Sequence, residues 1–172
     1  LEIDDLDGGS DSNLGYRSLV QGEMPEIRNF NTQSDECEWL LREIGELQSE
    51  GVDLADICLV SRTQSLLSDY AQALQEASID SCLLSRDQAD DRRKPGVRLA
   101  TMHRVKGLEF KVVFMTAANE GVVPLTRSIQ STKDVVEKKL KDLNERALFH
   151  VAATRAIKHL VVTSFGNPSS FL

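Results

Sequence analysis

The sequence predicts an α/β domain in which helices cover both faces of a mainly parallel β-sheet. The first observation behind this fold class is alternation: short apolar runs typical of strands are separated by stretches whose apolar residues recur at helical spacing. The second is the run "ICLV" at residues 57–60, which no polar residue interrupts, as expected of a strand covered on both faces.

The composition bounds the class of protein. The length of 172 residues suits one domain with a sizeable core. The net charge of −7 argues against a free-standing nucleic-acid-binding protein, because such proteins usually carry a basic surplus. No apolar run approaches the length of a membrane span, and the N-terminus lacks a signal-peptide pattern. Because the first residue, Leu1, is not Met, we expect the chain to be a piece of a longer protein.

Three cysteines, an odd number, lie far apart in apolar segments: Cys37, Cys58 and Cys82. This placement predicts buried free thiols in a protein from a reducing compartment. Neither the cysteines nor the three histidines show the spacing of metal ligands, so the sequence predicts no metal site.

The N-terminal elements follow from composition and periodicity. Residues 1–22 are predicted to be an acidic linker or tail, since their first part is rich in Asp, Gly and Ser and offers little to bury. The folded domain is predicted over residues 23–172. Its first strand is expected at residues 25–30, where apolar and polar residues alternate. A helix is then expected to begin after the N-cap Ser34 and to end at Gly51.

The remaining helices and strands are predicted in the same way. Apolar residues at helical spacing mark a second helix around residues 67–77 and a third over residues 133–156. The third helix is expected to pack through one apolar face, made by Val136, Leu140, Leu143, Ala147 and Val151. Further strands are predicted at residues 57–60, 79–84, 97–101, 111–118 and 159–164.

Two charged segments are expected to face solvent. Residues 85–96, "SRDQADDRRKPG", predict a solvated loop because they combine many charges with a closing Pro-Gly. The basic run "KKLK" at residues 138–141 is surrounded by acidic residues, so a mixed-charge solvent face is expected rather than a basic patch. These acidic residues are Asp134, Glu137, Asp142 and Glu145.

Polar chemistry is concentrated in residues 101–114, "TMHRVKGLEFKVVF". Ligand sites in parallel sheets form at the carboxyl ends of strands, so a strand ending near Thr101 would deliver Thr101 and His103 to such a site. Gly107 allows close backbone approach by a ligand or a neighbouring strand, and Glu109 could accept a hydrogen bond from a sugar hydroxyl. The alternative is a surface turn between two strands, in which Gly107 serves the turn.

Two arginines also lie where a ligand is expected. Arg62 follows a buried strand, and Arg155 lies near the end of the last helix. A planar guanidinium suits phosphate oxygens, although a solvated or salt-bridged side chain is the alternative for each arginine. The sequence has no G-x-x-x-x-G-K-[ST] phosphate loop and no acidic pair after an apolar strand to hold Mg²⁺. The chain alone therefore lacks a complete catalytic site.

Several segments resemble one family of DNA motors. Residues 101–114 resemble motif V of the UvrD/Rep/PcrA-type superfamily 1 DNA helicases, T-x-H-x-x-K-G-L-E-[FW]-x-x-V-[FI]. Residues 144–166, "NERALFHVAATRAIKHLVVTSFG", resemble their motif VI, E-x-R-L-x-Y-V-A-x-T-R-A. "ICLVSRT" is similar to motif IV, "NEGVVP" to the E-G-x-x-P after motif V, and "NPSSFL" to the segment beyond motif VI. The order and spacing agree over residues 25–172.

The resemblance implies the second, C-terminal RecA-like motor domain of such a helicase. Its fold would be a RecA-like, P-loop NTPase-type three-layer sandwich without the phosphate loop itself. In this family ATP binds between two RecA-like domains, and the first domain carries the phosphate loop, the Mg²⁺-binding acid and the catalytic Glu. The implied cofactors are therefore ATP and Mg²⁺, the latter held mainly by the first domain. The implied partners are single-stranded DNA and the N-terminal RecA-like domain, in the cytoplasm and away from any membrane.

The resemblance also assigns nucleotide contacts residue by residue. Arg62 of motif IV and Arg155 of motif VI would be the catalytic residues that contact the γ-phosphate. Glu109 would bind the ATP ribose, with Gly107 letting the backbone approach. Since the phosphate loop belongs to the other domain, the isolated chain is expected to be inactive.

The DNA backbone would be contacted by Thr101 and His103. The same short stretch would thus bind DNA at its start and nucleotide at its end. The sequence departs from the family at Ser61, where relatives often have an aromatic residue that stacks on adenine, and at His150, where motif VI usually has Tyr.

Two other functions remain as alternatives. The first is a non-catalytic helicase-like module that binds DNA or a partner, which would be free to lose Arg62, Glu109 and Arg155. The second is part of a helicase fused to a nuclease.

Overall fold

The computed structural model describes residues 2–4, 10–12, 24–85 and 90–172. Its main body is a six-stranded sheet in the order β3-β8-β7-β4-β6-β5, and every neighbouring pair in it is parallel. The strands are β3 (Glu26–Phe30), β4 (Ile57–Ser61), β5 (Ser81–Leu83), β6 (Val97–Thr101), β7 (Phe110–Met115) and β8 (Ala156–Phe165). The predicted α/β class with a mainly parallel sheet is confirmed.

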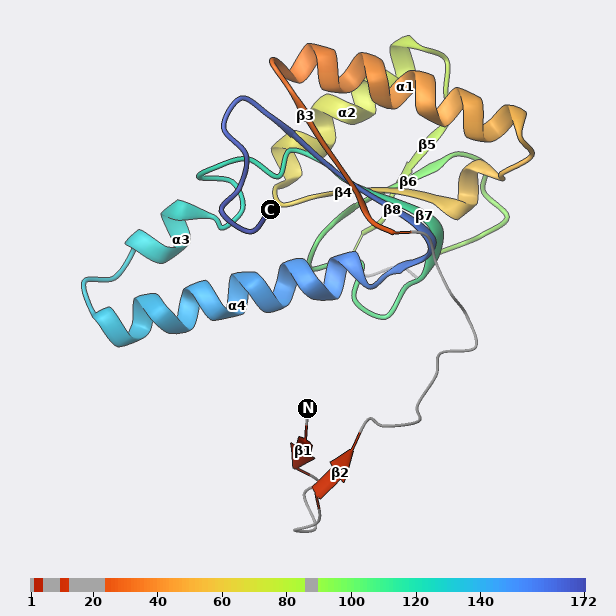
Figure 1. Cartoon of the computed structure of the whole chain (residues 1–172). Helices are drawn as coiled ribbons and strands as arrows, with labels where there is room; N and C mark the ends of the chain where they lie inside the picture. Colours follow the sequence, from red (N-terminus) through yellow and green to blue (C-terminus); the bar gives the residue numbers. More distant parts are fainter. Residues whose placement is uncertain (1, 5–9, 13–23, 86–89) are drawn as a thin grey trace.

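Helices lie on both faces of this sheet (Figure 1). Helices α1 (Gln33–Ser49) and α2 (Gln64–Glu76) lie on one side, and α4 (Val135–Ala153) lies on the other. Two short elements, the 3₁₀ helix η1 (Leu54–Asp56) and helix α3 (Thr126–Gln130), were not expected from the sequence.

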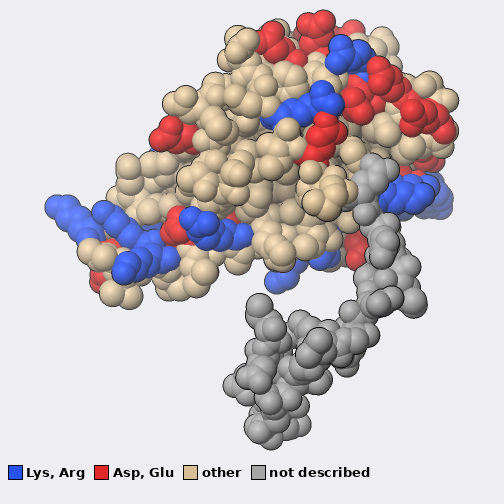
Figure 2. Space-filling view, in the orientation of Figure 1, with Lys and Arg blue, Asp and Glu red and all other residues tan. Residues whose placement is uncertain are grey.

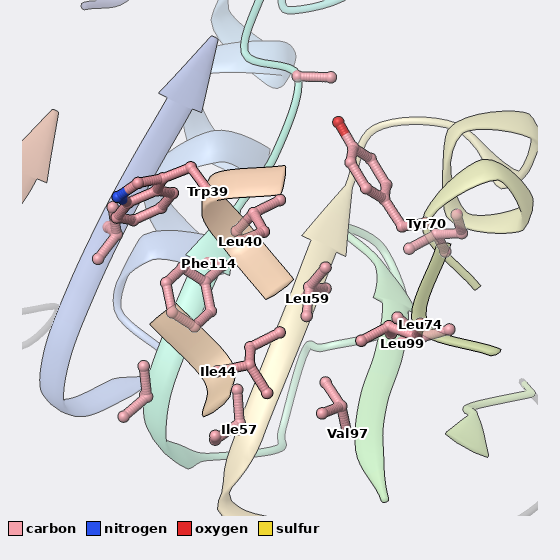
Figure 3. Packing of buried hydrophobic residues seen from close by; sticks show 14 residues of the cluster. Trp39, Leu40, Ile44, Ile57, Leu59, Tyr70, Leu74, Val97, Leu99 and Phe114 are labelled. Atoms are coloured by element: carbon pink, nitrogen blue, oxygen red, sulfur yellow. The ribbon is translucent and has the colours of Figure 1, made fainter. Parts of the chain in front are cut away.

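The larger core lies between the sheet and helices α1 and α2 (Figure 3). Trp39 and Ile44 of α1 and Leu74 of α2 pack with Leu59 of β4 and Phe114 of β7. Alternate residues of the same strands face the second cluster: Leu59 belongs to the first, and its neighbours Cys58 and Val60 belong to the second. This double burial is the reason for the uninterrupted apolar run at residues 57–60.

The helix starts are fixed by side-chain caps. Thr32, and not the predicted Ser34, is the N-cap of α1: its hydroxyl accepts from the Asp35 N–H, and Asp35 accepts from the Thr32 N–H. This reciprocal capping box satisfies two backbone donors, whereas Ser34 already lies inside the helix. At the other end, Gly51 adopts a φ of +89°, as predicted for the residue that ends this helix.

Helix α4 contradicts the predicted packing face. Val136, Leu140 and Leu143 are 74%, 55% and 61% exposed. The helix instead reaches the core through its last turns, where Ala152 is fully buried. Nineteen residues of helix extend about 28 Å, whereas the six residues of β7 extend about 20 Å, so the start of α4 projects beyond the sheet (Figure 1).

Charge is unevenly distributed over the surface. Asp and Glu side chains gather over α1, while basic and acidic side chains are interleaved around the projecting ends of α3 and α4 (Figure 2). The Glu137–Lys141 and Asp142–Arg146 ion pairs of α4 are solvent-exposed examples, as the sequence predicted for this helix. Glu145 is the exception, because it is buried.

The charged segment at residues 85–96 is less solvated than predicted. Arg98 on β6 is fully buried, and its guanidinium donates to Asp90 and to the carbonyls of Asp91, Lys94 and Gly96. A buried arginine needs this many acceptors, so the segment folds back around it. Residues 86–89 of the predicted loop lie outside the described residues.

The three cysteines are free, as predicted. Cys58 is buried, whereas Cys37 and Cys82 are only partly buried. Burial, with smaller contributions from Glu36 and Asp69, raises the pKa of Cys37 to about 11.

The predicted tail, residues 1–22, is described only in part. Strands β1 (Glu2–Asp4) and β2 (Ser10–Ser12) pair antiparallel within it. The other residues of this segment, and the predicted domain boundary at residue 23, lie outside the described residues, so the division stays a prediction.

A pair of identical substitutions tests the unequal packing of the helices. In the 172-residue chain, Leu74→Ala in the α2 core should lower the free energy of unfolding by about 2–5 kcal/mol through lost burial and a cavity. The matched variant Leu140→Ala, at an exposed position on α4, should change it by about 0.5 kcal/mol or less. Urea denaturation measures both, and equal losses would show that α4 packs through its apolar face after all.

Candidate functional site

A pocket of about 580 Å³ opens where strands β4, β5 and β6 end. Because these strands are parallel neighbours, their last residues and the loops that follow meet at one edge, called here the carboxyl edge. Three predicted site residues line the pocket: Arg62, Thr101 and His103. The register explains their proximity, since Ser61 pairs with Thr101 as the two strands end.

Arg62 is held by a buried carboxylate. Its Nε donates to Oε2 of Glu145 at 2.9 Å, and its Nη2 donates to Oε1 at 2.6 Å. The two side chains are only 11% and 8% exposed. Oε2 of Glu145 also accepts the Leu125 N–H at 3.0 Å. One carboxylate therefore links the end of β4, the loop before α3 and helix α4.

The environment of Glu145 favours its charged form. Burial by itself raises the pKa of this carboxyl group, but the hydrogen bonds from Arg62 and from the Leu125 N–H outweigh that effect. Arg62 and the nearby His103 add smaller electrostatic contributions in the same direction. The pKa of Glu145 is consequently lowered, and the ion pair is formed at neutral pH.

A second buried polar network lies beneath the carboxyl edge, between the ends of β4 and β7 and helices α1 and α2. The hydroxyls of Ser61 and Thr116, which end β4 and follow β7, are 2.5 Å apart. Glu36 of α1 accepts hydrogen bonds from the Ala117 N–H and from the Tyr70 hydroxyl. Burial and the adjacent Glu36 carboxylate raise the pKa of Tyr70, so its hydroxyl stays protonated and able to donate. Ser61 is fully buried, and its hydroxyl bonds with that of Thr116 inside the domain.

Residues 102–109 connect this edge to the opposite one. Thr101 ends β6, Phe110 begins β7, and the two strands run in the same direction, so the connecting segment must cross back to the edge where the strands begin, the amino edge. Met102 and Val105 bury their side chains in the second core cluster as the segment passes over the sheet. The segment is therefore held to the sheet along its course.

The end of this segment presents Gly107 and Glu109, both exposed. The Glu109 carbonyl accepts from Nη2 of Arg92 at 2.6 Å, which fixes the backbone at the start of β7. Gly107 has a φ of +83°, and a Cβ there would meet no atom within 4 Å. The need for glycine is thus the backbone conformation, and not close packing against a neighbouring strand.

Arg155 lies beside Glu109 at the amino edge. It follows the end of α4, and its carbonyl accepts the Phe110 N–H at 3.0 Å. Its side chain folds back along the last turn, where Nε donates to the Val151 carbonyl at 3.0 Å and Nη2 to the Thr154 hydroxyl at 3.1 Å. Among residues 24–85 and 90–172, no carboxylate forms an ion pair with Arg155.

The structure thus divides the predicted site residues into two groups. Arg62, Thr101 and His103 gather at the carboxyl edge, and Gly107, Glu109 and Arg155 gather at the amino edge. Helix α4 connects them, because Glu145 and Arg155 are separated by about 15 Å of helical rise.

Sequence reasoning missed two residues of this arrangement. Glu145 was assigned to a solvent-exposed face because its neighbours on α4 are charged, and its partner Arg62 lies 83 positions away. Arg92, in the charged segment, binds the carbonyls of Ala55 and Glu109. The leading Glu of the motif VI pattern falls on Glu145 and was the one local signal for it, whereas Arg92 carries none, since its partners come from other parts of the chain.

Comparisons with known proteins identify the family. A family model described as the UvrD-like helicase C-terminal domain matches residues 80–167. The chain belongs to this family. The ATP-dependent DNA helicase PcrA of Staphylococcus epidermidis is 30% identical over 164 residues, which cover 95% of this chain and 19% of that protein. PcrA of Bacillus subtilis is 36% identical over 104 residues, 60% of this chain and 13% of that protein. This UvrD-like domain therefore spans less than a fifth of the length of either relative.

Solved structures agree on the fold of the UvrD-like domain. The C-terminal domain of a possible DNA helicase from Lactobacillus plantarum has a TM-score of 0.62 at 17% identity, covering 88% of this chain and 80% of that one. The SWI2/SNF2 ATPase core of Sulfolobus solfataricus, solved with double-stranded DNA, has a TM-score of 0.54 at 10% identity. The match covers 81% of this chain and 27% of that one. The RecA-like fold class is confirmed. No helix among the described residues is long and apolar enough to cross a membrane.

The ion pair of Glu145 predicts a pH-dependent stability difference. Because the pKa of Glu145 is lowered from 4.5 on folding, its charged form stabilises the fold above pH 4.5, and this contribution disappears as the pH falls through the lowered value. Glu145→Gln should therefore be clearly less stable than wild type at pH 7, and the difference should shrink steadily below pH 4.5.

Denaturant unfolding of the 172-residue chain between pH 3 and 7 measures this difference. Asp142→Asn, which removes an exposed carboxylate from the same helix, is the control and should change stability little at any pH. A Glu145→Gln difference that does not depend on pH would show that the charge of Glu145 is not what stabilises the fold.

Proposed function

We propose that this chain is the C-terminal motor domain of an ATP-dependent DNA helicase or translocase, acting inside the cell with an N-terminal RecA-like domain of the same protein. One observation carries this proposal. Residues 101–109 run from a pocket at one edge of the sheet to exposed polar residues at the other edge. An element of this kind is suited to contact two ligands at once, DNA at Thr101 and His103 and nucleotide at Gly107 and Glu109.

The nucleotide half of the proposal rests on two arginines and one carboxylate. Glu109 is exposed next to the start of β7 and could accept a hydrogen bond from a ribose hydroxyl, with the open backbone of Gly107 nearby. Arg155 makes no ion pair within the described part of the chain, which supports the phosphate role over the structural salt bridge. Arg62 lies at the opposite edge from Arg155, and its partner Glu145 is separated from Arg155 by about 15 Å of helical rise, so contact of both arginines with one triphosphate requires the nucleotide to extend between the two edges.

Bound ATP would supply the γ-phosphoryl group that is transferred to water. During that transfer, negative charge spreads over the equatorial oxygens and develops on the leaving oxygen. Guanidinium N–H groups fixed at those positions stabilise the transition state more than the ground state, and such an arginine can raise the rate by about 10³–10⁵-fold.

The residues described here do not fit a Mg²⁺ site. Within residues 24–85 and 90–172, no group of three or more His, Cys, Asp or Glu side chains could hold a metal ion. Metal binding is therefore assigned to the N-terminal motor domain, together with the phosphate loop that this sequence lacks.

The DNA half of the proposal rests on the carboxyl-edge pocket. Thr101 and His103 can donate hydrogen bonds to phosphate oxygens, and such contacts fix the position of a strand without reading its sequence. The net charge of −7 makes strong DNA binding by this domain alone unfavourable at physiological salt. Single-stranded DNA is therefore proposed to lie across both motor domains.

Substitution of Arg155 tests the catalytic role. In the protein that carries both motor domains, Arg155→Ala should lower the DNA-stimulated kcat for ATP hydrolysis by about 10²-fold or more, because the transition state loses a positioned guanidinium. Arg155→Lys should lower kcat nearly as much, since an ammonium group cannot reproduce the planar fork of a guanidinium. The control Lys158→Ala, at an exposed position on β8, should leave kcat unchanged.

Phosphate release with and without single-stranded DNA measures these rates, and the isolated 172-residue chain should show none. Thermal unfolding should show that each variant changes the free energy of unfolding by about 0.5 kcal/mol or less, as expected of surface substitutions. If Arg155→Ala loses stability and all activities in proportion, Arg155 has a structural role. Hydrolysis by the isolated chain would contradict the assignment of the catalytic parts.

A further inference from the structure

We propose that Glu145 is the positioning residue for Arg62: it holds the guanidinium at the carboxyl edge so that its remaining N–H groups meet a phosphate oxygen of bound nucleotide. This inference rests on the proposed function, because it gives Arg62 a phosphate to contact. It adds a residue that belongs to neither the nucleotide contacts nor the DNA contacts described above.

The geometry of the pair leaves part of the guanidinium available. Glu145 occupies Nε and Nη2 of Arg62 in a bidentate arrangement. Nη1 has no acceptor recorded among the described residues, and Arg62 lines the pocket at the carboxyl edge. A planar fork held along one side can rotate very little, so the direction of the other N–H groups is fixed before a ligand arrives.

Glu145 is itself held from two further directions. Its backbone belongs to α4, and its Oε2 accepts the Leu125 N–H. The preceding loop is anchored as well, because the Val123 carbonyl accepts from the Ser169 hydroxyl and the Val123 N–H donates to the Asn119 carbonyl. The carboxylate thus has a rigid support, as a residue that orients another side chain requires.

A purely structural ion pair is the competing explanation. Burying two charges is costly, and an apolar pair of similar size often stabilises a fold as well or better. The exposed ion pairs of α4, such as Asp142–Arg146, avoid this cost. A buried pair that opens onto a pocket is better explained by the need to keep an arginine oriented there than by stability alone.

A double-mutant cycle in the protein that carries both motor domains tests the inference. The variants are Glu145→Gln, Arg62→Ala and the two combined, and the measurements are kcat, KM for ATP and melting temperature. Arg62→Ala should lower kcat strongly, and Glu145→Gln should lower it roughly tenfold with KM changed much less, because orientation and not affinity is lost. In the Arg62→Ala background, Glu145→Gln should have no further effect on kcat.

Two further variants keep the test decisive. Glu145→Asp retains the charge but shortens the side chain, so it should fold and still lower kcat, which covers the case in which Glu145→Gln does not fold. Asp142→Asn should leave kcat unchanged. If Glu145→Gln lowers kcat by the same factor with and without Arg62, or if neither Glu145 variant changes kcat, the positioning role is overturned while the proposed motor function stands. If Arg62→Ala leaves kcat unchanged, the phosphate role of Arg62 is itself wrong, and the inference falls with it.

Discussion

A buried carboxylate, that of Glu145, joins the parts of this domain on which the proposed site depends. The carboxylate accepts hydrogen bonds from Arg62 at the end of β4 and from the backbone N–H of Leu125 before α3. Glu145 itself belongs to helix α4. Breaking such a pair by removing one partner leaves an uncompensated buried charge, which typically costs about 3–5 kcal/mol. This interaction fixes the Arg62 side chain relative to α4, while the packing of Ala152 in the second core cluster holds the end of the helix that precedes Arg155.

The parallel sheet imposes the second constraint. Because β6 and β7 run in the same direction, the chain between them has to return from the carboxyl edge to the amino edge. Most parallel connections use a helix for this return, but here residues 102–109 make it as a turn-rich segment over the second core cluster. This connection buries Met102 and Val105 but exposes the polar residues His103, Lys106 and Glu109 along its length. It can therefore place DNA contacts and nucleotide contacts on one short, continuous piece of chain.

The sequence was sufficient to predict the alternation of strands and helices, since burial on both faces leaves unbroken apolar runs such as residues 57–60. It also placed candidate residues near strand ends, as the structure has them for Arg62 after β4 and Thr101 at the end of β6. It did not reveal that Glu145 is buried, because its neighbours on α4 are charged, or that Arg98 is enclosed by carbonyls of the preceding loop. A partner 83 positions away decides the burial of Glu145, and the folding back of the preceding loop decides that of Arg98. Periodicity carries no information about either.

The apolar face predicted for α4 failed for a related reason. Helical spacing shows that Val136, Leu140 and Leu143 share a face, but it does not show whether a sheet lies beneath that face. Helix α4 is longer than β7, the strand that it contacts, and only its last turns reach the core. The extent of the sheet beneath α4, and not the apolar pattern of the helix, determined which residues became buried.

Residues 101–109 are proposed to contact two ligands, one at each end. Equilibrium binding of single-stranded DNA and of a non-hydrolysable ATP analogue to His103→Ala and Glu109→Ala, in the protein with both motor domains, tests it most directly. His103→Ala should weaken DNA binding about fivefold or more and leave nucleotide binding unchanged, while Glu109→Ala should do the reverse, as expected for the loss of single hydrogen bonds at separate sites. If either variant weakened both ligands equally, or if the two effects were exchanged, the division of the segment into a DNA end and a nucleotide end would be contradicted.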